Sequence, residues 1–190
     1  MRQADDFRCS PASREAPSLE TCRWSTWVPV DTAVLCFVRS RTHVWLIHKK
    51  RGLGSGKVNG PGGRVHAGER TADAAIRETR EETGITPVDP VEYGRLDFVF
   101  TNGYSLSATV YVANGWTGVP VETDEARPFW CPIESIPYRR MWADDEFWLP
   151  AVLAGTTVHG RFIFSDDTML EHDVRHGRVS DLPSSSVKNE

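Results

Sequence analysis

Short apolar stretches along the middle of the chain predict β-strands. They are rich in Val, Leu, Ile, Phe and Tyr, residue types that suit a pleated, half-buried backbone. The predicted strands cover residues 33–38, 44–48, 96–100, 106–112, 129–131, 161–164 and 169–174, and the predicted helices cover 71–83 and 145–154. Strands outnumber helices and do not alternate regularly with them. This favours a mixed sheet in an α/β fold over a doubly wound parallel sheet.

The stretch 71–83 has the clearest helical period. Its small and apolar residues recur at helical spacing on one face: Ala72, Ala75, Ile76, Thr79 and Thr83. Thr71 is a candidate N-cap, and Gly84 is expected to end the helix. One face of this helix is therefore predicted to pack on the core.

The other face of the same helix gathers carboxylates. Glu78, Glu81 and Glu82 share it, because a helix turns by about 100° per residue. Their repulsion is relieved either by salt bridges such as Arg77 to Glu81, or by a hard divalent cation. Mg²⁺ is usually held by a few carboxylates while substrate phosphates complete its coordination, so the second possibility indicates phosphate chemistry. The preceding segment 60–63 is flexible, glycine-rich backbone that could approach an anion or offer a carbonyl to the metal.

Composition limits the classes of partner. The chain has 190 residues, of which 39% are hydrophobic, enough for one buried core. Its net charge of −4 gives no basic field that would attract a nucleic acid polymer. No apolar run approaches the roughly 18 residues of a membrane span, and no export signal is visible. The four cysteines include no Cys-x-x-Cys pair, which favours a reducing, cytoplasmic location.

Both ends of the chain differ from its middle. Residues 1–24 and 177–190 are polar and lack periodicity, so we expect them to be disordered tails. Residues 25–176 are then expected to form one domain. We expect this domain to act as a monomer.

The residues around the acidic helix also match a known pattern. A glycine, an isolated acid, an Arg-Glu pair, two further acids and a second glycine follow one another: Gly63, Glu69, Arg77, Glu78, Glu81, Glu82 and Gly84. In this order and spacing they resemble the Nudix box. Thr79 departs from it, because the family usually has an apolar residue there; since position 79 lies on the packing face, we expect an effect on packing rather than on chemistry. The resemblance implies an α/β/α sandwich around a mixed β-sheet.

Further segments resemble the oxidised-purine nucleoside triphosphate hydrolases, also called 8-oxo-dGTP diphosphatases. They are residues 49–52, 57–60, 121–125, 127–128 and 141–150. This resemblance implies that Asn59, Trp142, Asp144 and Asp145 hold the base. Their chemistry suits that role, because an indole offers a stacking surface, an amide offers a donor and an acceptor, and adjacent buried carboxyls can share a proton.

The same resemblance assigns other residues to substrate binding. Lys49 lies in a matching segment, and Leu53 stands where well-known members carry an aromatic residue, as does Pro61. We therefore expect a less aromatic wall and an altered preference among purines. Thr32 and Phe98 match pocket positions only approximately, because the first strands differ in length.

The resemblance as a whole implies a Mg²⁺-dependent nucleoside triphosphate pyrophosphohydrolase. It would release a nucleoside monophosphate and pyrophosphate from oxidised purine nucleotides, with Mn²⁺ as a substitute metal. The implied metal ligands are the Gly62 carbonyl and the side chains of Glu78, Glu81, Glu82 and Glu125. Glu81, Glu82 or Glu125 is the candidate base. Arg77 would support the acidic face by pairing, and Glu69 would orient Arg77.

Three alternatives stay open from the sequence. Asp144 and Asp145 alone suggest a helix cap, with Trp142 as a hydrophobic staple. A related enzyme could act on another nucleoside diphosphate derivative, such as ADP-ribose or a capped RNA end. A nucleotide-sensing module that no longer cleaves is the alternative outside enzymes.

Overall fold

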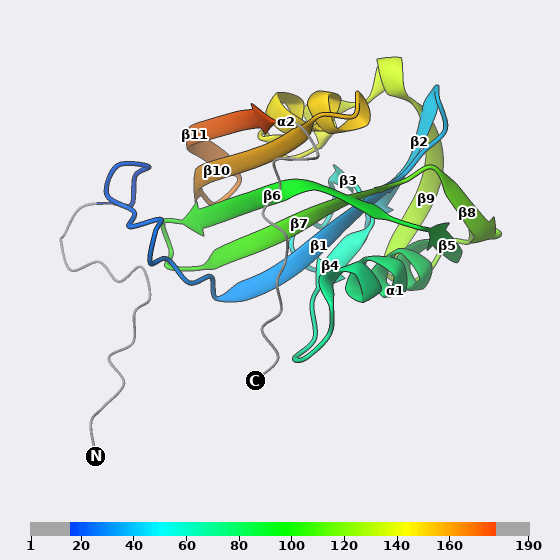
Figure 1. Cartoon of the computed structure of the whole chain (residues 1–190), viewed down its shortest axis with the longest axis horizontal. Coiled ribbons are helices and arrows are strands. Elements are labelled where there is room, and N and C mark those ends of the chain that lie inside the picture. The colour runs from blue at the N-terminus through cyan, green and yellow to red at the C-terminus, as the bar shows by residue number, and fades with distance from the viewer. Residues whose placement is uncertain (1–15, 178–190) are drawn as a thin grey trace.

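The computed structural model describes residues 16–177, so the predicted tail residues 1–15 and 178–190 lie outside the described part. Its largest element is a six-stranded sheet with the order β11-β10-β6-β7-β1-β4 (Figure 1). These strands are β1 (Asp31–Val38), β4 (Gly62–Arg64), β6 (Val91–Phe100), β7 (Ser105–Ala113), β10 (Thr157–Ser165) and β11 (Thr168–Gly177). β1 pairs with β7 and β10 with β6 in parallel, and the other neighbours are antiparallel. The sheet is therefore mixed, as predicted.

Smaller elements surround this sheet. A three-stranded sheet has the order β3-β2-β9, and a two-stranded sheet joins β5 to β8. Their strands are β2 (His43–Lys49), β3 (Val58–Asn59), β5 (Ile85–Val88), β8 (Gly115–Gly118) and β9 (Ala126–Pro132). The helices are α1 (Thr71–Thr83) and α2 (Asp145–Leu153), with short 3₁₀ turns η1 (Ile133–Ser135) and η2 (Tyr138–Arg140).

The two α-helices cover opposite faces of the six-stranded sheet (Figure 1). Alternate residues of β1 point to different cores, because strand side chains alternate between faces. Val34 and Cys36 pack in one core with Ala75 of α1. Phe37 packs in the other core and meets the Trp148 ring of α2 edge-on at 5.8 Å. The predicted α/β/α sandwich is confirmed.

Helix α1 begins and ends at the predicted residues. Gly84 ends it in the left-handed conformation, with φ of 76°, and its N–H donates to the Arg80 carbonyl. The predicted N-cap is wrong, because Arg70 occupies that position. Thr71 is the first helical residue, and its hydroxyl bonds the Tyr111 hydroxyl at 2.7 Å instead.

Thr79, the departure from the Nudix pattern, lies on the packing face as expected. Its side chain is fully buried, and its hydroxyl donates to the Ala75 carbonyl at 2.7 Å. A hydroxyl that bonds to the preceding helical turn leaves no unpaired polar group in the core. The helix therefore accommodates a polar residue where the family has an apolar one.

The sequence did not predict β3, β4, β5 or β8. These strands have only two to four residues each. A pattern with a period of two cannot be recognised over so short a stretch, and β4 begins with two glycines. Their existence depends on pairing with distant partners, such as β4 with β1.

Part of the predicted N-terminal tail packs on the domain. Cys22 is buried against Val99 of β6 and Ile163 of β10, and Leu19, Trp24 and Trp27 pack around the same cluster. This cluster lies on the reverse side of strands whose other residues form the larger core. Residues 16–24 therefore include side chains that belong to the packed structure.

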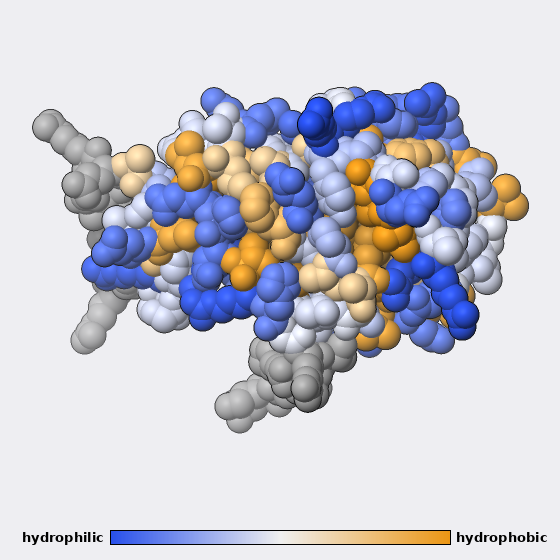
Figure 2. Space-filling model, turned by 90° about the horizontal axis from the view of Figure 1, so that it is seen from above, coloured by the Kyte–Doolittle hydropathy of each residue, from blue (hydrophilic) through white to orange (hydrophobic). Residues whose placement is uncertain are grey.

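Within residues 16–177, no helix is both long enough and apolar enough to cross a membrane. Seen from above, hydrophobic side chains form patches separated by hydrophilic ones (Figure 2).

Candidate active site

A cavity of about 420 Å³ lies between the six-stranded sheet, α1, and the segment that leads into α2. Both predicted groups of functional residues line it. From the acidic group come Gly62, Glu78, Glu82 and Glu125, and from the base-binding group come Lys49, Leu53, Asn59, Phe98, Trp142, Asp144 and Asp145. The fold thus brings together residues that are more than 80 positions apart in the sequence.

Glu82 is the most buried acid of α1, with 1% of its side chain exposed. Its carboxylate accepts hydrogen bonds from the Lys49 ammonium at 2.7 Å and from the Gly62 N–H at 2.8 Å. Burial raises its pKa, and Lys49 and the Gly62 N–H oppose that rise. The ion pair joins α1 to β2 at the floor of the cavity.

Glu78 lies against the backbone of β4. A Cβ atom on Gly63 would come within 2.3 Å of the Glu78 carboxylate, so only glycine allows this approach. Arg77 donates to the Glu78 carboxylate at 2.7 Å. Gly63 is therefore required for the position of an acid rather than for a turn.

Arg77 forms a network with the other acids of the box. Its guanidinium contacts both Glu69 oxygens, at 2.8 and 2.9 Å, and also bonds Glu81 at 3.1 Å. The hydrogen bonds from Arg77 lower the pKa of Glu69 to about 2. Glu69 is thus paired with Arg77 through both of its carboxylate oxygens. Neither Arg77 nor Glu81 lines the cavity, and 57% of the Glu81 side chain is exposed.

The acids suit a divalent metal by their chemistry, although they are paired with protein cations. Glu78 and Glu82 offer carboxylate oxygens, the ligands that hard cations prefer, to one cavity. Within residues 16–177, no group of three or more Asp, Glu, His or Cys side chains stands ready to hold a metal. Lys49 bonds one carboxylate oxygen of Glu82, and Arg77 bonds one of Glu78. Glu125 lies at the cavity wall, 3.7 Å from the Arg51 guanidinium.

At the other part of the cavity, Asp144 and Asp145 are 2% and 5% exposed. The Asp144 carboxyl accepts from the Trp148 indole N–H at 2.9 Å, and the Asp145 carboxyl accepts from the Trp142 backbone N–H at 3.1 Å. Burial raises the pKa of Asp144 to about 6. Burial and the neighbouring Asp144 raise the pKa of Asp145 well above its usual value.

The helix-cap alternative does not hold for the side chain of Asp144. Asp144 does occupy the N-cap position of α2, but its side chain makes no capping hydrogen bond. The carboxyls are instead held by Trp148 and Trp142 at the cavity wall. Both are therefore available to a ligand as buried, protonatable groups.

An aromatic wall that sequence analysis largely missed completes the cavity. Besides Phe98 and Trp142, it contains Phe100, Tyr104, Trp148 and Phe164. The Trp142 ring meets Phe164 edge-on at 5.6 Å and Phe100 at 6.4 Å. Phe100 was detectable, because it lies two residues after Phe98 and so shares its face of the strand. Phe164 and Tyr104 reach the wall only through the tertiary fold.

Two predicted contacts are placed differently from expectation. Thr32 is exposed and does not line the cavity, whereas the next residue, Ala33, does. Successive side chains of a strand point to opposite faces, so Thr32 and Ala33 face different sides of β1. Leu53 lines the cavity but remains 48% exposed, so the wall is open at this point.

Comparison with known proteins agrees with this geometry. Residues 20–152 match the model of the NUDIX domain. The chain is 41% identical over 136 residues to the oxidized purine nucleoside triphosphate hydrolase of Danio rerio, covering 70% of this chain and 86% of the relative. It is 36% identical to the protein of the same name from Mus musculus, over 74% of this chain and 92% of that one.

A solved structure shows the same fold. The mutator MutT protein from Bacillus halodurans superposes with a TM-score of 0.69 at 25% identity, over 76% of this chain and 97% of that chain. The family model covers the acidic helix, the glycine-rich strand before it and the paired aspartates, which are the residues that build the cavity. The chain belongs to the NUDIX domain family.

Proposed function

We propose that the chain is a nucleoside triphosphate pyrophosphohydrolase that acts on oxidised purine nucleotides. The observation that carries the proposal is the single cavity that joins two buried aspartic acids to the acids of α1. One group suits a purine edge, and the other suits a divalent metal that would bind the phosphates. The names of the two relatives support this substrate class.

The base would be held between Trp142 and the paired aspartates. Burial raises the pKa of both carboxyls and so favours their neutral forms, which lets Asp144 and Asp145 together offer a donor and an acceptor. The Asn59 amide adds a second donor and acceptor pair from β3. Moving one proton between the Asp144 and Asp145 carboxyls could therefore adapt the pair to different purine edges.

The phosphates would lie towards α1. NUDIX hydrolases generally require a divalent metal, and we propose Mg²⁺, with Mn²⁺ as a substitute. Glu78, Glu82 and the Gly62 carbonyl would hold it, together with Glu81 and Glu125. When bound, the ion would neutralise phosphate charge and lower the pKa of the attacking water.

The remaining residues of the box would position these acids. Arg77, itself bonded to Glu69, holds Glu78 in place, and Lys49 would be available to contact a substrate phosphate if Glu82 held a cation. The candidate base stays among Glu81, Glu82 and Glu125. Glu125 lines the cavity with its side chain half exposed, whereas both Glu82 oxygens are engaged. A monomeric, cytoplasmic protein without a nucleic acid polymer as partner remains our prediction.

A substrate screen tests the proposal. Purified protein with Mg²⁺ is given 8-oxo-dGTP, dGTP, ATP and ADP-ribose, and pyrophosphate and monophosphates are quantified. We expect pyrophosphate release to be fastest with the oxidised purine. Preferred cleavage of ADP-ribose, or binding without any turnover, would contradict the proposal and favour one of the alternatives.

A further inference from the structure

The glycine-rich loop between β2 and β3, residues 50–57, lies beside the proposed base pocket. Gly52, Gly54 and Gly56 all have φ between 75° and 86°. Internal hydrogen bonds fix the loop: the Gly56 N–H donates to the Lys49 carbonyl at 2.8 Å, and the Lys57 N–H donates to the Gly54 carbonyl at 3.0 Å. The loop thus depends on a left-handed backbone conformation that residues other than glycine adopt only with strain.

This loop touches Trp142 at the ring edge. A Cβ atom on Gly54 would lie 2.9 Å from the Trp142 indole nitrogen and 2.8 Å from the Asn59 amide nitrogen. Backbone therefore packs directly against two residues of the proposed base pocket. A displacement of the loop would therefore affect the positions of both Trp142 and Asn59.

The loop also touches Trp142 at the ring face. The Lys57 ammonium lies over the indole, 4.9 Å from the ring centroid, and bonds the Asp167 carboxylate at 3.0 Å. Trp142 lines the cavity, whereas Lys57 is not among the residues that line it. Lys57 is only 23% exposed, whereas Asp167 is 70% exposed.

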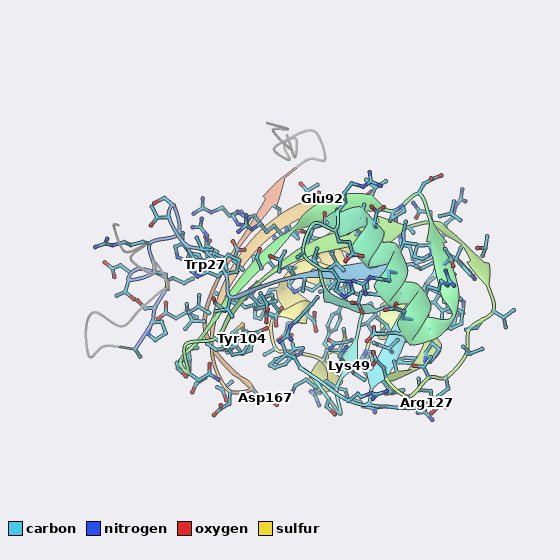
Figure 3. The ribbon with its side chains drawn as sticks, turned by 90° about the horizontal axis from the view of Figure 1, so that it is seen from below. Trp27, Lys49, Glu92, Tyr104, Arg127 and Asp167 are labelled. Atoms are coloured by element: carbon cyan, nitrogen blue, oxygen red, sulfur yellow. The ribbon has the colours of Figure 1, made fainter. Side chains whose placement is uncertain are left out.

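Asp167 belongs to the turn between β10 and β11, about 110 residues from Lys57 in the sequence. Figure 3 shows Asp167 near Tyr104, on the side of Lys49 away from α1. The turn continues β10, which carries Phe164 into the aromatic wall. The ion pair thus joins the loop, the indole and the strand of the wall.

We propose that Lys57 is a positioning residue that, anchored by Asp167, fixes the Trp142 indole as the stacking surface for the purine base. The inference rests on the proposed function. The other ring neighbours of Trp142, Phe100 and Phe164, meet it at steep interplanar angles of 75° and 89°. A cation over the ring restrains it by attraction to its π electrons. A fixed ring binds a base without the entropy cost of ordering it first.

A purely structural role gives a different expectation. Ion pairs at the surface contribute little, and one lost there lowers stability slightly without changing ligand affinity. The pair Arg175–Asp173 on β11 has an ordinary geometry of this kind, at 3.2 Å and largely exposed. Arg175→Met is therefore a matched control for Lys57→Met.

The test measures binding of 8-oxo-dGMP by calorimetry, so that no turnover is needed. We expect Lys57→Met to weaken binding about five- to tenfold, and Lys57→Arg to keep it within about twofold. Asp167→Asn should weaken it about two- to threefold, and the double variant no more than Lys57→Met alone, because both act through one ring. The control should bind like the unaltered protein.

Each outcome decides the inference. Unchanged binding by Lys57→Met, or additive losses in the double variant, would overturn it. If Lys57→Met fails to fold, Asp167→Asn and Lys57→Arg carry the same comparison, and equal affinity of Asp167→Asn and the unaltered protein overturns it. If the unaltered protein does not bind 8-oxo-dGMP, the proposed function fails and the inference falls with it.

Discussion

Two pairs of carboxyls that have different surroundings line the cavity. Glu82 and Glu78 face cations of the protein, Lys49 at 2.7 Å and Arg77 at 2.7 Å. Asp144 and Asp145 receive only neutral donors, an indole and a backbone N–H. Coulombic attraction favours the charged form, whereas burial without a cation favours the neutral form. Burial raises the pKa of Glu82 as it does those of Asp144 and Asp145, but only at the α1 end does a protein cation oppose that rise.

The largest effect should come from removing charge at the cationic end. Glu82→Gln keeps the side-chain volume but loses a charge opposite Lys49, so turnover at saturating Mg²⁺ should fall by about 10² or more. Steady-state kinetics with a thermal melt as control measure this. Lys49 keeps 16% exposure, so its ammonium can turn to water and the fold should persist. Near-normal turnover would contradict the catalytic role proposed for Glu82.

At the neutral end, the change should affect selection rather than chemistry. We expect Asp145→Asn to weaken transition-state binding of 8-oxo-dGTP by about 1–3 kcal/mol, because a buried donor or acceptor is left mispaired. Kinetics on 8-oxo-dGTP and dGTP give the ratio of kcat/KM. Trp142→Ala serves as comparison and should weaken both purines more evenly. A ratio unchanged by Asp145→Asn would show that the carboxyl does not read the base.

The pH dependence of stability separates the two ends further. The pKa of Asp144 is raised from 3.8 to about 6 in the folded protein. A proton bound more tightly by the folded state gives stability that is fully present below pH 3.8 and lost as pH rises through about 6. The free energy of unfolding should fall by about 2 kcal/mol over this range. Urea titrations should show a flatter profile for Asp144→Asn, and an identical slope would contradict the assignment.

The smallest expected effect concerns the open wall near the neutral end. Leu53→Phe places an aromatic ring at the 48% exposed position of the cavity wall. Stacking of one further ring should improve purine affinity by about 0.5–1.5 kcal/mol. Calorimetry with 8-oxo-dGMP measures this, with Leu53→Met as the control for size. Equal affinities for both variants would mean that the base does not reach this side.

The sequence predicted local structure well where one period extended over a long segment. Helix α1 was found with its bounds, and the acids of its polar face were located with it. The same analysis grouped Glu81 with these acids, and Glu81 does share their bonds to Arg77, although 57% of its side chain is exposed. A helical face spans a broad angle, and only the neighbouring strand decides which part of that face is covered. Gly63 and Gly62 of β4 make that choice by contacting Glu78 and Glu82.

Long-range contacts were not predictable from local patterns. The contact between Lys57 and Asp167 joins two turns with no shared period, and Tyr104 follows a turn rather than a recognised strand. Thr32 was expected at the cavity and does not line it. In a strand, a difference of one residue is enough to place a side chain on the opposite face. The paired aspartates were recognised only through the family resemblance, since adjacent acids before a helix ordinarily suggest a cap.

The packing of residues 16–24 has a practical consequence for protein engineering. A shortened protein that starts at the predicted domain boundary, residue 25, would lose Leu19, Cys22 and Trp24 and would open Val99 and Ile163 to water. Val99 and Ile163 lie next to Phe98, Phe100 and Phe164 on the same two strands, and these three aromatic residues line the cavity. Removing residues 16–24 would therefore expose an apolar surface on the reverse side of the strands that form the cavity wall. Shortened proteins should accordingly keep residues 16–24.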